Sequence, residues 1–550
     1  MAENKSKFLI PAIGAVALVA GSIAAYMYLF RGPSGGVSGA LASAKIVPDN
    51  ALMATFISTD PQAWSQLQKF GTPEAQKIVT KSLQDITDKT LTENHLSYEK
   101  DLKPWIGGVM IAVLPPTAVK PTQATPPKTE VQNVLIVVGI KDKISALNFA
   151  NKLKEDKSAK FQEKDYKGEK IIESNNNGKA MYSAVLDDHL VVAPEKRVVE
   201  QAIDTFKGQP SFANKQGVDN LLSQGVDVEN TLAQIYVSDY AATMQMLATN
   251  PNTAQLPPQT LAQIKQVKSV VAGVGVDNAG LRLKAIAKLD PQAIKFENQT
   301  TNAKVVSQFP SDTIALVNGQ GISRSWSTLV EQSKNNPQFQ DGLNQARSQL
   351  ETANLDLDKD IFGWMDGEFA FGLIPSNQGF LQGIGFGGAF VFDTSDRKTA
   401  EATLTKLDTL AKSNTLNVAQ RNVGGKQITD WQAPQGALIS HGWLDNNRVF
   451  LALGSPVVEP LSTSTGEHLN NSPTFKAVTS TLQQPNSGYL YVDMDKTMSL
   501  VNRFASQTQQ PIPPETSAIF NSIRGLGVTA TQPDKSTSQV EMLLGLKPKS

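Results

Sequence analysis

Hydrophobic and polar residues follow three patterns along the chain. An uncharged run of 23 residues, FLIPAIGAVALVAGSIAAYMYLF, extends from Phe8 to Phe30. Beyond it, short apolar stretches bounded by turn residues, such as HLVVA at 189–193 and GLRLKAIAKL at 280–289, are typical of β-strands. Between them lie segments such as 144–155, whose apolar residues fall on one stripe of a helix.

The order of these elements predicts the fold class. Neighbouring strands joined by tight turns pair antiparallel, and several strand pairs have no helix between them that could serve as a crossover. We therefore expect an α+β fold of mainly antiparallel sheet packed with helices, and we disfavour a doubly wound parallel sheet.

The run from Phe8 to Phe30 predicts a transmembrane helix, because at ~1.5 Å per residue it exceeds the ~30 Å hydrocarbon core of a bilayer. Lys5 and Lys7 precede the run and Arg31 follows it. This small excess of positive charge predicts a cytoplasmic N-terminus and an exported C-terminal bulk. We expect residues 1–31 to be a cytoplasmic tip and membrane anchor.

A cleaved signal peptide is the competing interpretation of the same run. Ala42-Ser43-Ala44 has the small residues of a cleavage site. However, this site lies far beyond the run, and the run is longer than the ~7–15 apolar residues of a usual signal peptide. Residues 32–47, which are rich in Gly, Ser and Ala, are expected to form a flexible tether.

The rest of the chain contains one pattern twice. PDNALMA at 48–54 matches PSDTIAL at 310–316, and DLKPWIGG at 101–108 matches DIFGWMDG at 360–367. Later matches, including a glycine-rich GVGV at 273–276, follow in the same order. The matches predict two tandem homologous α+β units, 48–295 and 310–550, joined by a linker at 296–309.

Composition narrows the functions that this architecture could serve. The 51 Lys and Arg balance the 51 Asp and Glu, so the basic stripe of a nucleic-acid-binding protein is not expected. Cysteine is absent, which excludes disulfides, a thiolate nucleophile and cysteine-ligated metals. The four histidines lack the spacing of a zinc site. We expect no catalytic residue, no metal and no cofactor, and hence no enzyme.

Two short motifs suggest chemistry but are better explained by structure. Residues 383–388 satisfy G-x-G-x-x-G, yet they run into an apolar strand rather than a helix, so a dinucleotide site is not expected. Asp187-Asp188-His189 resembles an acid pair beside a base. The second unit has Asp445-Asn446-Asn447 at the matching place, so we predict a hairpin turn, with His189 exposed at its edge.

Tryptophan and methionine positions carry the one candidate site. Four tryptophans occupy matched positions in the two units, and methionines occur near a Pro-Pro break in the first unit and near its counterpart in the second. Such residues either pack in the core or line an apolar groove for a ligand or a partner segment. The groove candidates are Trp64, Trp105, Trp326, Trp364, Met244, Met246 and Met498.

The N-terminal anchor, the PDNAL strand and the DLKPWIGG element together resemble the domain of unknown function 3352 family, a cyanobacterial family, over essentially the whole chain. The resemblance implies a single-pass membrane protein whose bulk faces the periplasm or the thylakoid lumen. It implies no catalytic residue, cofactor or substrate.

Two functions remain open from the sequence. The first is a non-enzymatic interaction or scaffold module held at the membrane, since tandem units on a tether present two similar surfaces. The second is the binding or handling of a lipid or pigment, since aromatic residues recur in each unit.

Overall fold

The computed structural model describes residues 39–78, 97–115, 133–154, 160–176, 179–215, 222, 226–248, 264–292, 299–334, 337–463 and 466–549. Their strands are β1 (Met53–Ile57), β2 (Ile106–Leu114), β3 (Asn133–Ile140), β4 (Lys160–Tyr166), β5 (Glu169–Asn176), β6 (Lys179–Leu186), β7 (His189–Ala193), β8 (Thr231–Val237), β9 (Val267–Val276), β10 (Gly280–Leu289), β11 (Ala315–Gln320), β12 (Glu368–Pro375), β13 (Phe386–Asp393), β14 (Asn417–Val423), β15 (Lys426–Ala433), β16 (Gly436–Trp443), β17 (Arg448–Leu453), β18 (Tyr489–Asp493), β19 (Ile523–Asp534) and β20 (Thr537–Leu546).

In the described part of the chain, twelve α-helices precede or separate these strands in sequence. They are α3 (Ala40–Ala44), α4 (Pro61–Leu67), α6 (Lys143–Lys154), α7 (Lys196–Phe206), α9 (Tyr240–Ala248), α11 (Ile322–Ser333), α12 (Pro337–Glu351), α13 (Arg397–Ser413), α14 (Val458–Ser462), α15 (Pro473–Thr479), α16 (Met494–Thr508) and α17 (Pro514–Asn521).

Side-chain caps fix where several helices begin. The carboxylate of Asp493, the last residue of β18, accepts a hydrogen bond from the backbone N–H of Lys496 at 3.1 Å, so α16 starts directly after the strand. Asp60 caps α4 in the same way, with Pro61 as its first helical residue. Both caps satisfy backbone N–H groups that would otherwise lack a partner at the helix start.

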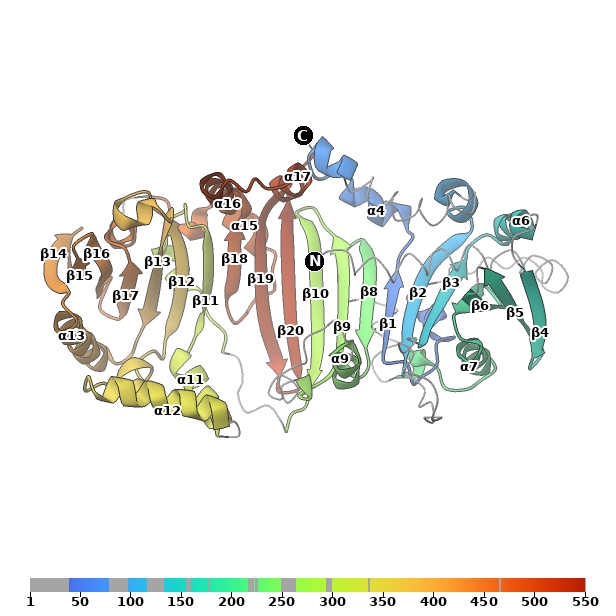
Figure 1. The fold of residues 1–550 in the computed structure, drawn as a ribbon, viewed down its shortest axis with the longest axis horizontal. Helices are drawn as coiled ribbons and strands as arrows, with labels where there is room; N and C mark the ends of the chain where they lie inside the picture. The colour runs from blue at the N-terminus through green and yellow to red at the C-terminus, as the bar shows by residue number, and fades with distance from the viewer. Residues whose placement is uncertain are drawn as a thin grey trace.

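All twenty strands join in one antiparallel sheet (Figure 1). Their pairings give the spatial order β4-β5-β6-β7-β3-β2-β1-β8-β9-β10-β20-β19-β18-β11-β12-β13-β17-β16-β15-β14. The prediction of an α+β fold with a mainly antiparallel sheet is confirmed, because every one of these pairings is antiparallel.

The two halves of the sheet have the same internal order. Strands β1 to β10 are arranged as 4-5-6-7-3-2-1-8-9-10, and β11 to β20 follow that order with ten added to each number. The halves meet where β10 pairs with β20, in a register that runs from Gly280 opposite Gly545 to Lys288 opposite Thr537.

A buried ionic cluster fastens this seam. The guanidinium of Arg282 on β10 donates to Asp277 in its own half at 2.7 Å and, across the seam, to the carboxylate of Glu541. It also donates to the hydroxyl of Thr481 at 2.7 Å. Burial disfavours the charged guanidinium, but its hydrogen bonds to the two carboxylates outweigh burial and raise the pKa of Arg282.

Several described residues of the two segments expected to be linkers are buried in the cores. In the segment expected to be a flexible tether, residues 40–44 form α3, and Ala44 and Val47 are fully buried in the core of the first half. In the expected linker 296–309, Val305 and Phe309 are fully buried in the core of the second half. The reason is that each half closes one side of its sheet with the apolar residues that precede its first strand.

The predicted membrane anchor, Phe8 to Phe30, lies outside the described residues. In the part of the chain that the structure describes, no helix combines the length and the apolar character needed to cross a bilayer.

Candidate functional site

The two faces of the sheet are covered unequally. On one, which we call the core face, Leu316, Tyr491 and Leu543 have no more than 1% of their surface exposed. Helix α15 packs against β18, β19 and β20 on this side. Successive residues of a strand point to opposite faces, so the neighbours of these buried residues lie on the other side, which we call the open face.

A continuous apolar row crosses the open face. Directly paired residues on twelve adjacent strands, from β2 to β17, are all apolar, and we call them the central row. Its members in spatial order are Val109, Ile57, Ala233, Val274, Leu283, Met542, Val528, Leu490, Val317, Phe371, Phe390 and Leu451. With strands ~4.8 Å apart, the row is about 53 Å long.

Two further rows flank the central row, two residues away along the strands. The upper row, on the side of α17, consists of Val276, Leu281, Leu544, Leu526, Val492, Ala315 and Leu373. The lower row consists of Ile111, Thr55, Ile235, Ala272, Ala285, Val540 and Ala530. Thr55 is the single polar residue in the three rows, and none of their members is charged.

The central row is accessible to solvent. None of its twelve side chains is fully buried. Leu490, Val317 and Phe390 are 42%, 40% and 43% exposed, and Phe371 lies between the last two with its ring centroid 4.4 Å from that of Phe390. A contiguous apolar surface of this extent is unusual on a soluble monomer and marks a site for a ligand, a partner or a membrane.

Aromatic clusters cover the two outer ends of the open face. In the first half, Trp105 stacks on Phe149 of α6 at 5.5 Å between ring centroids, above buried residues of β3 and β7. In the second half, Trp364 contacts Phe392 edge-on at 5.8 Å, beneath α13. The uncovered apolar surface is therefore the middle of the sheet, around the seam of the two halves.

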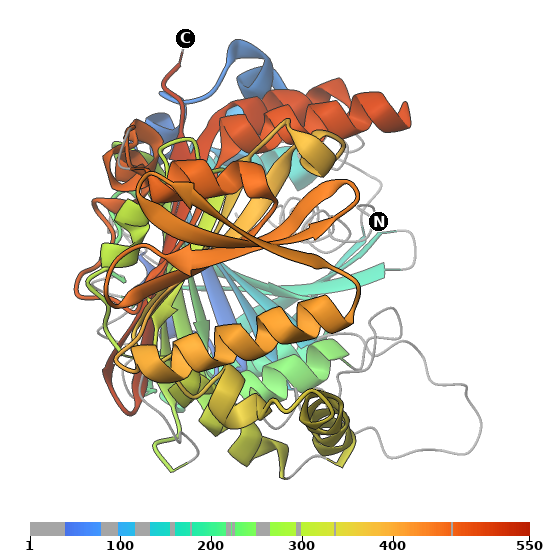
Figure 2. The same ribbon diagram turned by 90° about the vertical axis from the view of Figure 1, so that its left-hand side faces the viewer.

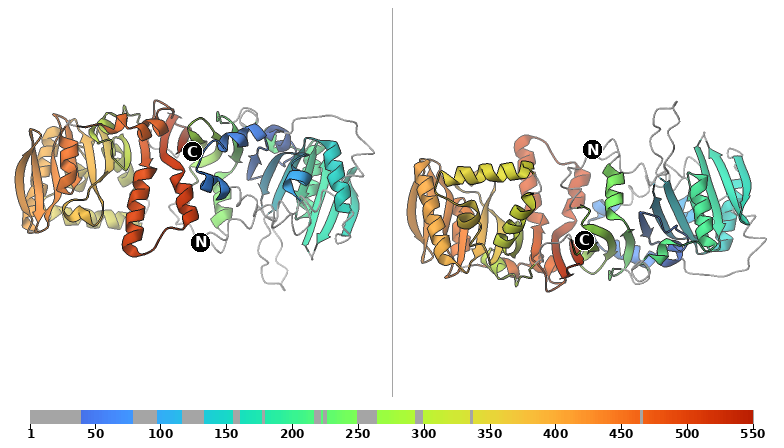
Figure 3. Two further views of the ribbon diagram at one scale, coloured as in Figure 1. Left: turned by 90° about the horizontal axis from the view of Figure 1, so that it is seen from above. Right: turned by 90° about the horizontal axis from the view of Figure 1, so that it is seen from below.

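Helices border the open face along both of its long edges. Figures 2 and 3 show α16 and α17 projecting from one edge, and α9, α11 and α12 projecting from the opposite edge toward the same side of the sheet. Some of their apolar side chains are also exposed, including Val501 and Phe504 on α16 and Phe520 on α17, each 38% exposed.

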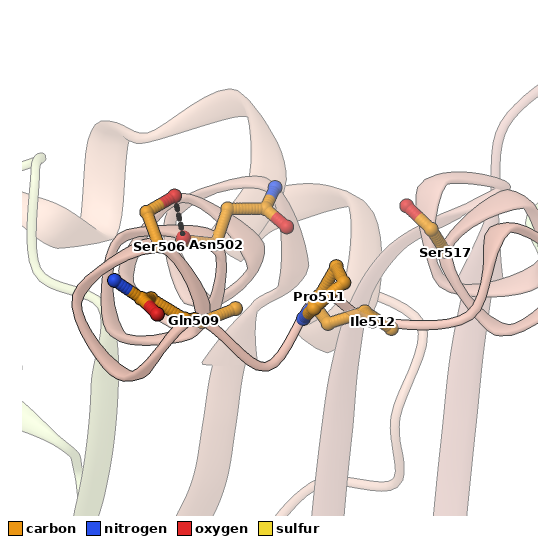
Figure 4. Close-up of a pocket in the computed structure, with 7 residues that line it drawn as sticks. Asn502, Ser506, Gln509, Pro511, Ile512 and Ser517 are labelled. Carbon is orange, nitrogen blue, oxygen red and sulfur yellow. Dashed lines mark hydrogen bonds between the residues drawn. The ribbon is translucent and has the colours of Figure 1, made fainter.

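A depression of about 460 Å³ lies between α16 and α17 (Figure 4). Its lining is uncharged and consists of Asn502, Ala505, Ser506, Gln509, Pro511, Ile512 and Ser517. The hydroxyl of Ser506 donates to the backbone carbonyl of Asn502 at 2.9 Å, as is usual within a helix. The depression offers apolar and hydrogen-bonding contacts but no titratable group.

The matched tryptophans Trp105 and Trp364 are structural. Their side chains are 1% and 3% exposed, and each indole N–H donates at 2.8 Å to the carbonyl oxygen of an aspartate four residues earlier, Asp101 or Asp360. These two residues cover the ends of the open face rather than line an open groove.

Trp64 and Trp326 are half-buried on helices at the border of the sheet. The indole of Trp64 on α4 donates to the carbonyl of Ser58 at 2.7 Å, and its ring packs with the cluster at the upper end of β8 and β9. Trp326 on α11 stacks on Phe362 at 4.0 Å and donates to Asp358 at 2.7 Å.

The three methionines lie on the bordering helices. Met244 and Met246 are half-buried on α9, which packs against β9. Met498 is 5% exposed on α16, which packs against β19. The structure thus distributes the seven predicted groove residues around the open face and does not bring them together in one groove.

The Asp187-Asp188 pair forms the predicted turn between β6 and β7, with Asp187 at φ 55°. Lys143 pairs with Asp188 at 2.6 Å. The expectation that His189 is exposed is wrong: it is 7% exposed, because β7 pairs with strands on both sides. Burial lowers the pKa of His189.

Residues 383–388 lead into β13, as expected for a strand approach rather than a dinucleotide loop.

One histidine–carboxylate pair occurs at the far end of the sheet. His441 Nε2 lies 2.7 Å from Asp408 Oδ1, which also accepts the indole N–H of Trp431 at 2.6 Å. Burial alone would raise the pKa of Asp408, but these hydrogen bonds outweigh it and the pKa is lowered. The adjacent hydroxyl of Ser440 donates to Asp430, away from this pair.

Among the described residues no group of three or more His, Cys, Asp or Glu is placed to hold a metal ion.

Sequence reasoning missed the open face for a physical reason. In β19 the large residues Leu526 and Val528 alternate with Gly525 and Gly527. Large apolar residues are ordinarily expected to face the core, yet here the glycines do. A Cβ atom at Gly527 would lie 2.0 Å from the carbonyl oxygen of Val478 on α15, so only glycine allows the helix to pack this closely. Alternating glycine and large apolar residues were the available signal.

Comparisons with known proteins give a family and no function. Two solved structures of TP0453 are similar: crystal form III has 7% identity and a TM-score of 0.28, covering 46% of this chain and 82% of that chain. Crystal form IV has 9% identity and a TM-score of 0.27, covering 44% and 79%. The sequence matches none of the curated proteins with which it was compared. The model of the family described as protein of unknown function (DUF3352) matches residues 12–546, so the chain belongs to this family.

Proposed function

We propose that this protein is a membrane-tethered, non-enzymatic protein that binds an apolar ligand of the lipid class on the open face. One observation carries the proposal: three adjacent rows of paired residues on the middle strands are uncharged and, apart from Thr55, apolar, and no residue of the central row is fully buried. Of the two functions that the sequence leaves open, this geometry favours the handling of a lipid or pigment.

The magnitudes fit an extended ligand better than a small one. Fully burying a Val, Leu or Phe side chain contributes about 1.5–3 kcal/mol, so covering five side chains that are 39–49% exposed would contribute about 3–6 kcal/mol. Four of the five belong to the rows, Val317, Phe390, Leu490 and Val540, and the fifth, Leu453, lies two residues beyond Leu451 on the same face of β17. Association itself costs at least ~4 kcal/mol. Tight binding therefore needs an occupant long enough to cover the half-buried members of the rows as well.

The proposed location rests on the sequence. The uncharged run from Phe8 to Phe30 would anchor the protein in the membrane as a single-pass segment, with a cytoplasmic N-terminus and the sheet in the periplasm or thylakoid lumen. An apolar binding face beside a bilayer would be close to its source of ligand. The balanced charge of the chain gives no support to a nucleic-acid partner.

We also propose that the two halves are tandem homologous units. Supporting this are the collinear sequence matches and the same strand order in both halves. One match is shifted. The sequence pairs GVGV at 273–276 with GLGV at 525–528, and Tyr236 with Tyr491. Tyr236 lies opposite Val271 and Tyr491 opposite Gly527, so with the tyrosines aligned the two glycine-rich segments are offset by four residues.

An interaction or scaffold role is the second candidate. The exposed apolar side chains of α16 and α17 support it, because they lie beside the open face on a pair of helices at its edge. Affinity co-purification from solubilised membranes would test it: a reproducible partner lost on Phe504→Ser substitution supports this role, and an unaltered set of co-purifying proteins contradicts it.

Binding of an apolar fluorescent probe to the delipidated, detergent-solubilised full chain tests the main proposal. We expect Leu490→Lys and Phe390→Lys each to weaken binding at least tenfold, because either places a charge in the central row. Ile144→Lys is the matched control, since Ile144 is 72% exposed on α6 and outside the rows. Equal binding by all three variants, with unchanged melting temperatures, would contradict the proposal.

A further inference from the structure

We infer that the ligand of the open face is the linear acyl chain of a membrane lipid, lying across the strands between the apolar rows. This inference rests on the proposed function and adds the class and the orientation of the ligand.

The spacing of the side chains gives the direction. On one face of a sheet, paired residues of adjacent strands are ~4.8 Å apart, whereas neighbours along a strand are ~6.8 Å apart. The central row therefore forms a nearly continuous ridge across the strands, with furrows between it and the upper and lower rows. In the lower furrow the side chains of Ala272, Ala285 and Ala530 are small, which widens it near the seam.

The length of the rows fits acyl chains. One leaflet of a bilayer holds each chain in about half of its ~30 Å hydrocarbon core, or ~15 Å. Without its two end residues, which pack against the aromatic clusters, the central row runs from Ile57 to Phe390 over about 43 Å, so it exceeds the length of a single acyl chain about threefold. A chain lying along a furrow would contact side chains of three or four strands.

The charge pattern fits a hydrocarbon rather than a lipid headgroup. The charged residues of the seam strands point away from the open face: Arg282 alternates with Leu281 and Leu283, and it pairs with Glu541 on the core face. Because the three rows hold no charge, they offer no partner for a phosphate or carboxylate. The affinity would depend on the acyl chain of the lipid and little on its headgroup.

The bordering helices disfavour a second sheet as the occupant. Two sheets pack face to face at ~10 Å. Helices α16 and α17 on one edge, and α9, α11 and α12 on the other, project from the open side (Figures 2 and 3). Helices along both edges would obstruct the approach of a second copy of this sheet, whereas a single acyl chain is thin enough to lie between them.

Displacement of the fluorescent probe by a series of fatty acids and of phospholipids with one headgroup, from 10 to about 18 carbons, tests the inference on the full chain. We expect affinity to rise by up to ~4-fold per methylene and to depend little on the headgroup. A planar ring-shaped pigment should compete at least tenfold less well.

A substitution that keeps the face apolar distinguishes binding in a furrow from non-specific binding to an apolar surface. Ala285→Phe should reduce the factor by which each added methylene raises the affinity at least twofold, because the new ring fills the lower furrow. Ile144→Phe is the matched control, because Ile144 lies on α6 outside the rows and is 72% exposed, and it should leave the gain unchanged.

The outcomes separate the two proposals. Loss of probe binding in the central-row variants, together with no dependence on chain length or with equal competition by the ring-shaped pigment, overturns the inference while the proposed function stands. Absence of any probe binding overturns both. If the delipidated protein instead forms a dimer that does not bind the probe, the inference is overturned in favour of self-association through the open face.

Discussion

Removing Arg282 should weaken the attachment of the two halves more than any other single side-chain deletion at the seam. Its guanidinium is 11% exposed and binds Asp277 from the first half and Glu541 and Thr481 from the second. Arg282→Leu fills similar space but leaves two carboxylates without their cation. Asp277 keeps two backbone N–H donors, Ala279 at 2.8 Å and Gly280 at 3.0 Å, whereas Glu541 keeps one, Gln483 at 2.8 Å.

The size of the effect follows from burial. Removing one partner of a buried ion pair costs ~3–5 kcal/mol, because the other charge remains without compensation. Replacing both partners with apolar residues of similar volume is often neutral. We therefore expect Arg282→Leu to lower the free energy of unfolding by about 3–5 kcal/mol, and the added substitution Glu541→Leu to recover most of that loss.

Urea denaturation followed by tryptophan fluorescence measures this loss, and limited proteolysis detects separation of the halves. Arg448→Leu is the matched control, since Arg448 is 15% exposed and binds Asp393 at 2.6 Å within the second half. It should destabilise without separating the halves. A loss below ~1 kcal/mol for Arg282→Leu, or no recovery in the double variant, would refute the reasoning.

The other predictions concern packing, protonation and backbone strain. Trp105→Ala and Trp364→Ala should each cost about 3–5 kcal/mol in urea denaturation, and a loss under ~1 kcal/mol would show that the site tolerates a cavity. The pKa of His189 is lowered from 6.5 by burial, so the unfolded chain binds the proton first and stability falls as pH drops below ~6.5, by up to ~1.4 kcal/mol per unit. His189→Gln should flatten this dependence, and an unchanged slope would contradict it. Gly488→Ala should cost over ~2 kcal/mol, because φ is +125° and the new Cβ would lie 2.0 Å from a carbonyl oxygen. Gly436→Ala, at φ +116° with open space around it, should cost only ~1 kcal/mol, and equal losses would exclude the steric explanation.

Local sequence patterns were sufficient to predict the class of fold, an α+β fold with a mainly antiparallel sheet. Short apolar strands separated by tight turns implied antiparallel pairing, and the turn at Asp187-Asp188 was predicted from Asp and Asn at matched places. The hydrogen-bonding of Trp105 and Trp364 to the fourth preceding residue recurs in both halves, in line with their matched positions in the sequence.

Burial of the segments before each half could not be predicted from composition. Residues 40–44 are mostly small and continue the Gly- and Ser-rich segment expected to be a tether, yet Ala44 and the nearby Val47 are buried in the core beneath the first sheet half. His189 shows the same limit, because its burial depends on β3, a strand far from it in sequence. Contacts of this kind depend on neighbours that no local window contains.

The sequence by itself determined that the chain has a long uncharged run, two matched series of strands and helices, no cysteine and no net charge. Only the tertiary structure decided which face of each strand is covered. At 525–528 in β19 both alternations are apolar, and the close approach of α15 assigns the glycines to the core and Leu526 and Val528 to the open side. Likewise, the pairing of β10 with β20 aligned separate apolar strands into one long row. A period of two fixes which residues share a face, but which of the two faces is buried depends on what packs against it.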